Sequence, residues 1–351
     1  MIDNQNNKLA NTSSEITSCS KEIAAVNTYS FFSANLLNFI PSIPFDLHPY
    51  LFKEFRKNKK RNGIDATSFS AVYPYPIVGW ETIDKMMLNG ASILCTFHFG
   101  PFQLLNYVLV KQEEAYCLLV ARETYDKWRE RYPNLIKLLC QAQAKGLFDL
   151  INVNDRNALR TMYRQTAEGR KLLIYVDGLE GMSNERQSSL QKINFLGQII
   201  TVPSGAAQLS WSLKLPLQPV IAEQIGDTVN LRFGKAIYPN GGVNRDLYLH
   251  MTMQSLFSFV SYYIMRRPEL WTNWPSAHLY LGSKPPIEDS IFDELSAANL
   301  HARKFGLFSS GEQYFLLRKK DYLSFVITGL EFSQLLEDPH FSGVVDNTPS
   351  V

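Results

Sequence analysis

Residues 91–100 read Ala-Ser-Ile-Leu-Cys-Thr-Phe-His-Phe-Gly, a short apolar run that ends on a polar side chain and a glycine. A run of this length after Gly90 is typical of a buried strand. His98 stands where such a strand would end. The segment therefore predicts a strand in the interior of a sheet, with a histidine delivered at its carboxyl end.

Similar apolar runs recur along the chain, and stretches with helical patterning separate them. We expect strands at residues 91–97, 116–120, 148–153, 171–176, 217–222 and 228–237. The expected helices are 80–88, 101–110, 132–144, 155–168, 204–214 and 248–266. Pro101 suits the first position of the helix after His98. Strands that alternate with helices predict an α/β fold with a mixed, largely parallel sheet flanked by helices.

The two ends of the chain differ from this middle part. Residues 1–20 are rich in Asn, Ser and Thr and predict a flexible tail, and residues 21–75 predict an aromatic-rich, helical N-terminal cap. Pro41, Pro44 and Pro49 are expected to break this cap into short pieces, which either cover the core or form an amphipathic surface for lipid or a fatty chain. The α/β domain would span 76–284. Residues 285–351 predict a small α+β appendage, with a hairpin around 319–321 and a helix at 330–336.

Composition narrows the class of protein. With 45% hydrophobic and 13% aromatic residues the chain can bury a large core, which excludes disorder of the whole chain. A net charge of +2 and the lack of long basic runs argue against nucleic-acid binding. The short basic cluster at 57–61 is either a solvated loop or a contact for an acidic membrane surface or a phosphorylated carrier.

The cysteines predict a reduced environment and no metal site, because none lies in a CxxC pair or beside a histidine cluster. They are Cys19, Cys95, Cys117 and Cys140. The polar N-terminus lacks the apolar segment of a signal peptide, and no apolar run of about 20 residues is present for a spanning helix. We expect a cytoplasmic protein, with peripheral contact at the inner membrane surface as a further expectation.

Three of the expected strands end on a polar side chain that chemistry could use. His98, Arg122 and Asp177 each follow an apolar strand and precede a turn. Because ligands of α/β sheets bind beyond the carboxyl ends of parallel strands, we expect the three side chains to converge there. A histidine in such a place can take a proton from a hydroxyl or amine. Each residue also has a structural alternative: a buried structural histidine, a surface ion pair for the arginine, and a turn or cap for the aspartate.

An ordered set of motifs extends this pattern over residues 75–281. The motifs are 91–100, 120–123, 155–160, 169–171, 176–177, 194–198, 202–207, 215–220 and 267–271. In this order they resemble the late acyltransferases of lipid A biosynthesis, within the lysophospholipid acyltransferase superfamily. The resemblance implies a glycerolipid acyltransferase-like fold. It also implies transfer of a fatty acyl group to a hydroxyl or amine from an acyl-carrier-protein (phosphopantetheine) or CoA thioester, which is a co-substrate and not a bound cofactor.

The resemblance further implies roles for single residues. His98 corresponds to the general base, Arg122 would hold the phosphopantetheine or carboxyl end of a ligand, and Asp177 would orient a partner. The remaining substrate-binding residues would wall a tunnel for the acyl chain, although an ordinary core would use the same types: Phe99, Gly100, Phe102, Phe195 and Gly197.

The sequence departs from the family five positions after the histidine, where Gln103 replaces the acid of the His-x4-Asp/Glu motif. A carboxamide can accept a hydrogen bond but cannot balance the charge of an imidazolium. Three interpretations stay open. The acid has moved, with Asp177 or Glu180 as candidates; the acceptor is an amine or thiol that needs less help from a base; or catalysis is lost and the fold is a non-catalytic module that binds acyl chains or carrier proteins.

Two further departures concern the acceptor. After Trp271 the basic residues of the family are replaced by Asn-Trp-Pro-Ser at 273–276, and the usual N-terminal membrane helix is not recognisable. Both argue against a lipid A precursor as the acceptor. By analogy, a soluble or carrier-bound acceptor in a specialised pathway, such as lipopeptide or polyketide biosynthesis, fits the sequence better.

Overall fold

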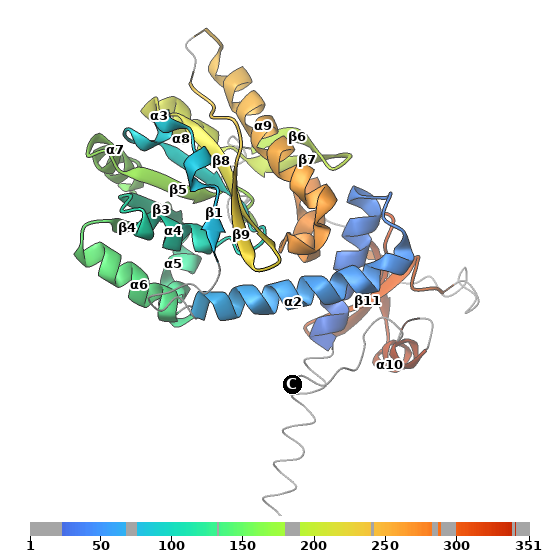
Figure 1. The fold of residues 1–351 in the computed structure, drawn as a ribbon. Coiled ribbons are helices and arrows are strands. Elements are labelled where there is room, and N and C mark those ends of the chain that lie inside the picture. The colour runs from blue at the N-terminus through green and yellow to red at the C-terminus, as the bar shows by residue number, and fades with distance from the viewer. Residues whose placement is uncertain are drawn as a thin grey trace, which may run out of the picture. The chain divides into compact units, whose positions relative to one another are not determined.

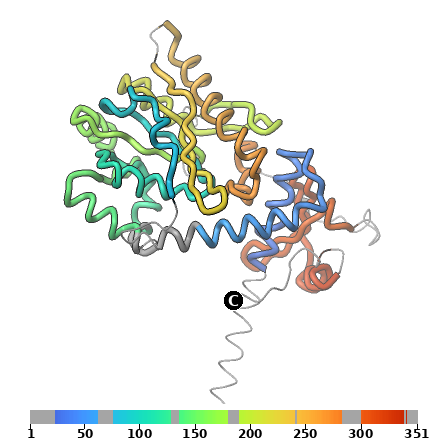
Figure 2. The backbone as a smooth tube through the Cα atoms, in the orientation of Figure 1, coloured from blue at the N-terminus to red at the C-terminus, as the bar shows by residue number. Residues whose placement is uncertain are grey.

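A computed structural model describes residues 23–67, 76–131, 133–179, 190–239, 242–282, 287–288, 300–338 and 341. The chain divides into two compact units. One consists of Glu54–Thr272, and the other joins Met1–Lys53 with Asn273–Val351. Figure 1 labels the helices and strands, and Figure 2 traces the backbone through them.

The larger unit is built on a seven-stranded sheet in the order β1-β9-β8-β2-β5-β3-β4. Its strands are β1 Ile77–Val78, β2 Ile93–Thr96, β3 Tyr116–Val120, β4 Phe148–Asn152, β5 Lys171–Tyr175, β8 Leu217–Ile225 and β9 Thr228–Phe233. Neighbouring strands run parallel except for β8 and β9, which pair antiparallel. The predicted mixed, largely parallel sheet is confirmed.

Helices flank this sheet (Figure 1). They are α3 Lys85–Leu88, α4 Leu104–Lys111, α5 Arg122–Arg131, α6 Pro133–Ala144, α7 Ala158–Ala167, α8 Gly205–Leu213 and α9 Arg245–Arg266, with 3-10 turns η2 Trp80–Thr82 and η5 Pro268–Leu270. β2 and β3 are buried along their whole length, as their apolar runs predict. Within the described part of the chain, no helix combines the length and apolar character needed to cross a membrane.

The helix after His98 begins later than the sequence predicts. α4 starts at Leu104, whereas the proline pattern predicts a start at Pro101. After Gly100, with a φ of 58°, residues 101–103 form a turn closed by hydrogen bonds between residues three apart and not by α-helical bonds. In that turn the Leu104 N–H donates to the Pro101 carbonyl at 2.9 Å.

A hairpin that the sequence analysis did not predict follows β5 in the chain. β6 Leu190–Phe195 and β7 Gln198–Pro203 pair antiparallel through a two-residue turn. Leu196 and Gly197 have φ values of 49° and 80°, as the tight turns that match strand twist require. The side chain of Gln254 on α9 accepts from the Asn194 N–H and donates to its carbonyl, which fastens the hairpin to α9.

The smaller unit contains a helix at 23–39, and a 3-10 turn η1 Phe45–Leu47 leads into α2 His48–Thr67, which runs on into the larger unit. Pro41 and Pro44 lie between these helices, as predicted breaks should. The predicted break at Pro49 is wrong, because Pro49 stands in the first turn of α2, where its missing N–H is not needed.

The smaller unit also contains the 3-10 helix η6 Trp274–Leu281 and a four-stranded sheet, β10-β13-β12-β11, followed by α10 Gly329–Glu337. β11 Phe305–Ser310, β12 Gln313–Arg318 and β13 Leu323–Ile327 are antiparallel, and β10 Ile287–Glu288 runs parallel to β13. The predicted turn at 319–321 joins β12 to β13, and a second turn at Gly311 makes one strand more than predicted. The predicted boundaries at 20, 75 and 284 lie outside the described residues and stay predictions.

The helix at 23–39 covers the outer edge of this sheet, where β11 is the last strand. Asn27 accepts from the Ser309 N–H at 2.9 Å and donates to the Ser309 carbonyl at 3.0 Å. The Ser30 hydroxyl donates to the Leu307 carbonyl at 2.7 Å. Side chains of the helix thus take up hydrogen-bonding positions that a further strand would fill.

Candidate active site

The ends of β2 and β5 bring His98 and Asp177 to one place. The two strands are parallel neighbours, with Thr96 opposite Tyr175. Each functional side chain follows two residues after these paired positions. The site therefore lies beyond the carboxyl ends of adjacent parallel strands, the position at which α/β sheets bind ligands.

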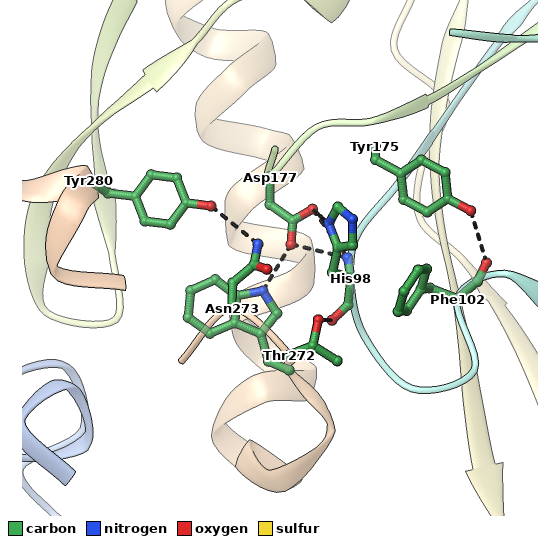
Figure 3. Close-up of polar contacts among 8 residues, drawn as sticks. His98, Phe102, Tyr175, Asp177, Thr272, Asn273 and Tyr280 are labelled. Carbon is green, nitrogen blue, oxygen red and sulfur yellow. Dashed lines mark hydrogen bonds and ion pairs between the residues drawn. The ribbon is translucent and has the colours of Figure 1, made fainter. Parts of the chain in front are cut away.

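His98 and Asp177 are joined by hydrogen bonds from the ring and the backbone (Figure 3). Nδ1 of His98 lies 2.8 Å from Oδ1 of Asp177. The His98 backbone N–H donates to both carboxylate oxygens at 3.1 Å, and the Trp271 indole N–H donates to Oδ2 at 2.9 Å. Asp177 is fully buried, whereas 30% of the His98 side chain is exposed. The carboxylate is shielded from solvent while the imidazole reaches the surface.

This arrangement suits a general base. The N–H donors around Asp177 offset the cost of burying a charged carboxylate. When Nδ1–H donates to that carboxylate, the lone pair of the imidazole lies on Nε2. A histidine in this tautomer can remove a proton from a nucleophile, and the carboxylate then stabilises the imidazolium.

Trp271 reaches Asp177 because a short ribbon of backbone holds residues 270–272 against the end of β2. Phe99 and Trp271 form an antiparallel bridge. The backbone N–H of Thr272 donates to the His98 carbonyl at 2.9 Å, and its hydroxyl donates to the same oxygen at 3.1 Å. The backbone on both sides of the imidazole is therefore fixed.

Gly100 allows this ribbon to form. Its N–H donates to the Leu270 carbonyl at 2.9 Å, and its φ is 58°. A Cβ at this position would lie 2.3 Å from the Ala222 carbonyl oxygen, which is backbone and cannot rotate away. The close approach explains why a glycine follows the strand here.

Two aromatic rings bracket the imidazole. The ring of Tyr175 lies 5.0 Å from that of His98 at a tilt of 35°, and Phe102 meets it edge-on at 4.9 Å. The Tyr175 hydroxyl donates to the Phe102 carbonyl at 3.4 Å and accepts from the buried Asn106 amide at 3.3 Å. These contacts restrict rotation of the imidazole.

Gln103 stands where the resemblance to acyltransferases predicts an acid, but its contacts are not with His98. Its carbonyl accepts from both the backbone and the side-chain N–H groups of Asn106, each at 3.1 Å. Its Oε1 is buried, with no hydrogen-bond partner among the described residues. The carboxyl group that pairs with His98 Nδ1 belongs to Asp177. Glu180, the other candidate for a relocated acid, lies outside the described residues.

Arg122 starts α5 after β3, at the same edge of the sheet. Its guanidinium is exposed and lies 3.7 Å from the carboxylate of Asp155, and its backbone N–H donates to Asn154 at 3.0 Å. The described contacts of Arg122 are thus with the loop after β4. They correspond to the surface ion pair that the sequence left open, and convergence of Arg122 with His98 and Asp177 stays a prediction.

The predicted tunnel residues have different surroundings. Phe102 lies beside His98, whereas Phe99 is fully buried. Phe195 packs edge-on against Trp271 at 5.4 Å, and Gly197 forms the exposed hairpin turn. Phe99 and Phe195 are therefore buried in the core, Phe195 against Trp271, and the acyl tunnel stays a prediction.

Sequence reasoning missed the roles of Trp271, Thr272 and Tyr175. Tyr175 had a usable signal, because it precedes Asp177 by two and alternate residues of a strand share a face. Trp271 stands in the last of the ordered motifs, but a motif does not reveal which strand it will contact.

Comparison with known proteins adds no assignment. The sequence matches no known protein-family profile, and a search of curated proteins finds no significant match.

Proposed function

We propose that this protein transfers an acyl group from an acyl-carrier-protein or CoA thioester to a hydroxyl or amine, with His98 as general base and Asp177 as its acid partner. One observation carries the proposal: the 2.8 Å contact between Nδ1 of His98 and Oδ1 of the fully buried Asp177. Of the three interpretations of Gln103, this contact favours a relocated acid.

The reaction follows from the position of the proton acceptor. Nε2 of His98 removes the proton of the acceptor hydroxyl or amine, and the oxygen or nitrogen attacks the thioester carbonyl carbon. The tetrahedral intermediate then expels the thiolate, which takes the proton back from the imidazolium. Asp177 stabilises the imidazolium between these two steps and stays ionised throughout.

Two further features support acyl transfer over other base-catalysed reactions. The ordered motifs over 75–281 resemble acyltransferases of the glycerolipid acyltransferase-like fold, and His98 lies where their base lies. The departures at Gln103 and 273–276 favour a soluble or carrier-bound acceptor of a specialised pathway. We also propose the cytoplasm, with peripheral membrane contact, as the place where such thioesters are met.

The test uses a long-chain acyl thioester of carrier protein, labelled in the acyl group, with a panel of hydroxyl and amine acceptors and with water. The full-length protein and the His98→Ala variant are compared for release of free thiol and for movement of label. His250→Ala is the matched control, because His250 is an exposed histidine on α9. We expect turnover that is lost in His98→Ala and retained in His250→Ala.

The other outcomes decide against the proposal. Turnover that persists in His98→Ala would exclude His98 as the base. Stable binding of the thioester without thiol release, with every acceptor in the panel, would favour the non-catalytic binding module.

A further inference from the structure

We infer that Trp271 is a positioning residue of this site: its indole N–H sets the orientation of the Asp177 carboxylate and thereby the tautomer of His98. The inference rests on the proposed function for its meaning. Its geometry and its main test do not depend on catalysis.

The two oxygens of Asp177 have different partners. Oδ1 faces Nδ1 of His98 at 2.8 Å, and Oδ2 accepts from the Trp271 indole at 2.9 Å. The His98 backbone N–H, at 3.1 Å from both oxygens, does not distinguish between them. Among these contacts, the indole and the imidazole are the groups that select one rotation of the carboxylate.

The indole is itself held rigidly. Trp271 is fully buried, and Phe195 packs edge-on against its ring at 5.4 Å. Its backbone is tied to the end of β2 by the bridge to Phe99 and by the hydrogen bonds of Thr272 to the His98 carbonyl. Residues 270–272 carry the indole and also bind the backbone of His98. The indole and the imidazole, the two groups that contact the carboxylate, are therefore held in a fixed relation to each other.

An acid in the His-x4-Asp/Glu motif would be oriented by the helix that carries it. Asp177 lies outside that motif, and the Trp271 indole orients it instead. Fixing the outer oxygen of a carboxylate is how supporting hydrogen bonds select one imidazole tautomer and one ring orientation. Without the indole donor, Oδ2 loses a hydrogen bond that holds the rotation of the carboxylate, and we expect the proton of a neutral imidazole to be less confined to Nδ1.

The main test reads the tautomer directly. Nitrogen-15 shifts of the His98 ring are recorded in the full-length protein at a pH where the imidazole is neutral. We expect the wild type to carry the proton on Nδ1, and Trp271→Phe to show a mixture of the two tautomers. Phe195→Leu is the matched control, because it loosens the packing around the indole and leaves its N–H in place. A single Nδ1–H tautomer in Trp271→Phe, or an equal mixture in both variants, would overturn the inference.

A second measurement covers the case in which Trp271→Phe does not fold. In the wild-type protein labelled with nitrogen-15 tryptophan, the Trp271 indole resonance is followed while His98 is titrated. We expect it to shift together with the His98 signal, unlike the resonance of Trp211, whose ring packs against that of Tyr248 at 5.3 Å and a tilt of 43°. An indole resonance of Trp271 that does not shift during the titration would refute the coupling between Trp271 and His98.

Kinetics separate this inference from the proposed function. If thioester transfer occurs, Trp271→Phe should lower kcat about 10- to 100-fold with little change in KM, as expected when a catalytic group is misplaced. Changed tautomers without transfer in the wild type would leave the positioning inference standing and refute the proposed reaction. A normal tautomer in Trp271→Phe, together with His98-dependent transfer in the wild type, would support the proposed reaction and refute the positioning inference.

Discussion

Replacing Asp177 by Asn is the most informative single change at the site. The side chain keeps its size in a position that is fully buried, so the packing beyond the end of β5 is preserved. The change removes the negative charge 2.8 Å from Nδ1 of His98 and brings an amide N–H among N–H donors. To recover a hydrogen bond, the imidazole must present a lone pair at Nδ1, which places its proton on Nε2 and blocks the base.

The expected loss can be estimated from the distance between the charges. With Nδ1 and Oδ1 2.8 Å apart, the charge centres of imidazolium and carboxylate lie about 4 Å apart, which corresponds to about 4 kcal/mol at an effective dielectric constant of about 20. Since about 1.4 kcal/mol changes a rate tenfold, the lost charge alone lowers kcat about 10³-fold. The wrong tautomer adds to this, and we expect a total of about 10³- to 10⁴-fold.

The assay is single-turnover release of thiol from an acyl-carrier thioester, followed by absorbance after reaction of the thiol with a chromogenic disulfide. Asp155→Asn serves as the control, because Asp155 is an exposed acid at the same edge of the sheet and pairs with Arg122. Thermal unfolding of both variants checks that the fold is retained. If Asp177→Asn is folded and stays within about tenfold of the wild type, the charge argument fails.

Three further changes test the surroundings of the site and the smaller unit. Gly100→Ala should lower the free energy of unfolding by at least about 2 kcal/mol, because the residue has a positive φ and the added Cβ would lie 2.3 Å from the Ala222 carbonyl oxygen. Chemical denaturation measures this loss, and an unchanged midpoint contradicts the close approach. Gln103→Glu should leave turnover no higher than in the wild type. It should also cost about 1–3 kcal/mol of stability, since it places a charge on an atom that is buried without a partner among the described residues. A gain in transfer would show that an acid at position 103 can still assist His98. Burial lowers the pKa of Lys319 to about 7, so the unfolded chain binds more protons above that pH and stability should rise by about 2–3 kcal/mol between about pH 7 and about pH 9. Lys319→Met should abolish this rise in urea titrations, and a rise that persists in the variant would assign it to other groups.

The central part of the site could be predicted from the sequence because it depends on local pattern. An apolar run that ends on His98 and another that ends on Asp177 predict buried strands with polar ends, and both strands are present. The sheet rule then places strand ends at one edge. What the pattern could not supply was the order of the strands, in which β2 lies next to β5. That adjacency brings His98 against Asp177, whereas the described contacts of Arg122, which follows the other neighbour of β5, are with the loop after β4.

The remaining parts depend on contacts between distant segments. Trp271 reaches Asp177 through an isolated bridge to Phe99, a kind of pairing for which no periodicity exists in the sequence. The start of α4 was misplaced because Pro101 carries a helix signal, whereas the first hydrogen bond after it, from the Leu104 N–H to the Pro101 carbonyl, is that of a turn. Gln103 predicted the loss of the acid that pairs with His98, because the sequence does not show that the Asp177 carboxylate contacts His98 instead.

The contacts of Asn27 and Ser30 with β11 have a consequence for the solubility of the protein. An uncovered edge strand is a template for pairing with other chains, and β11 carries the apolar sequence Phe-Gly-Leu-Phe at 305–308. The carboxamide of Asn27 satisfies both backbone groups of Ser309 and so denies that register to an incoming strand. Removal of the first forty residues would therefore leave the edge strand β11 without its cover. The helix at 23–39 thus protects a strand from the other end of the sequence, and we expect a chain without this helix to aggregate.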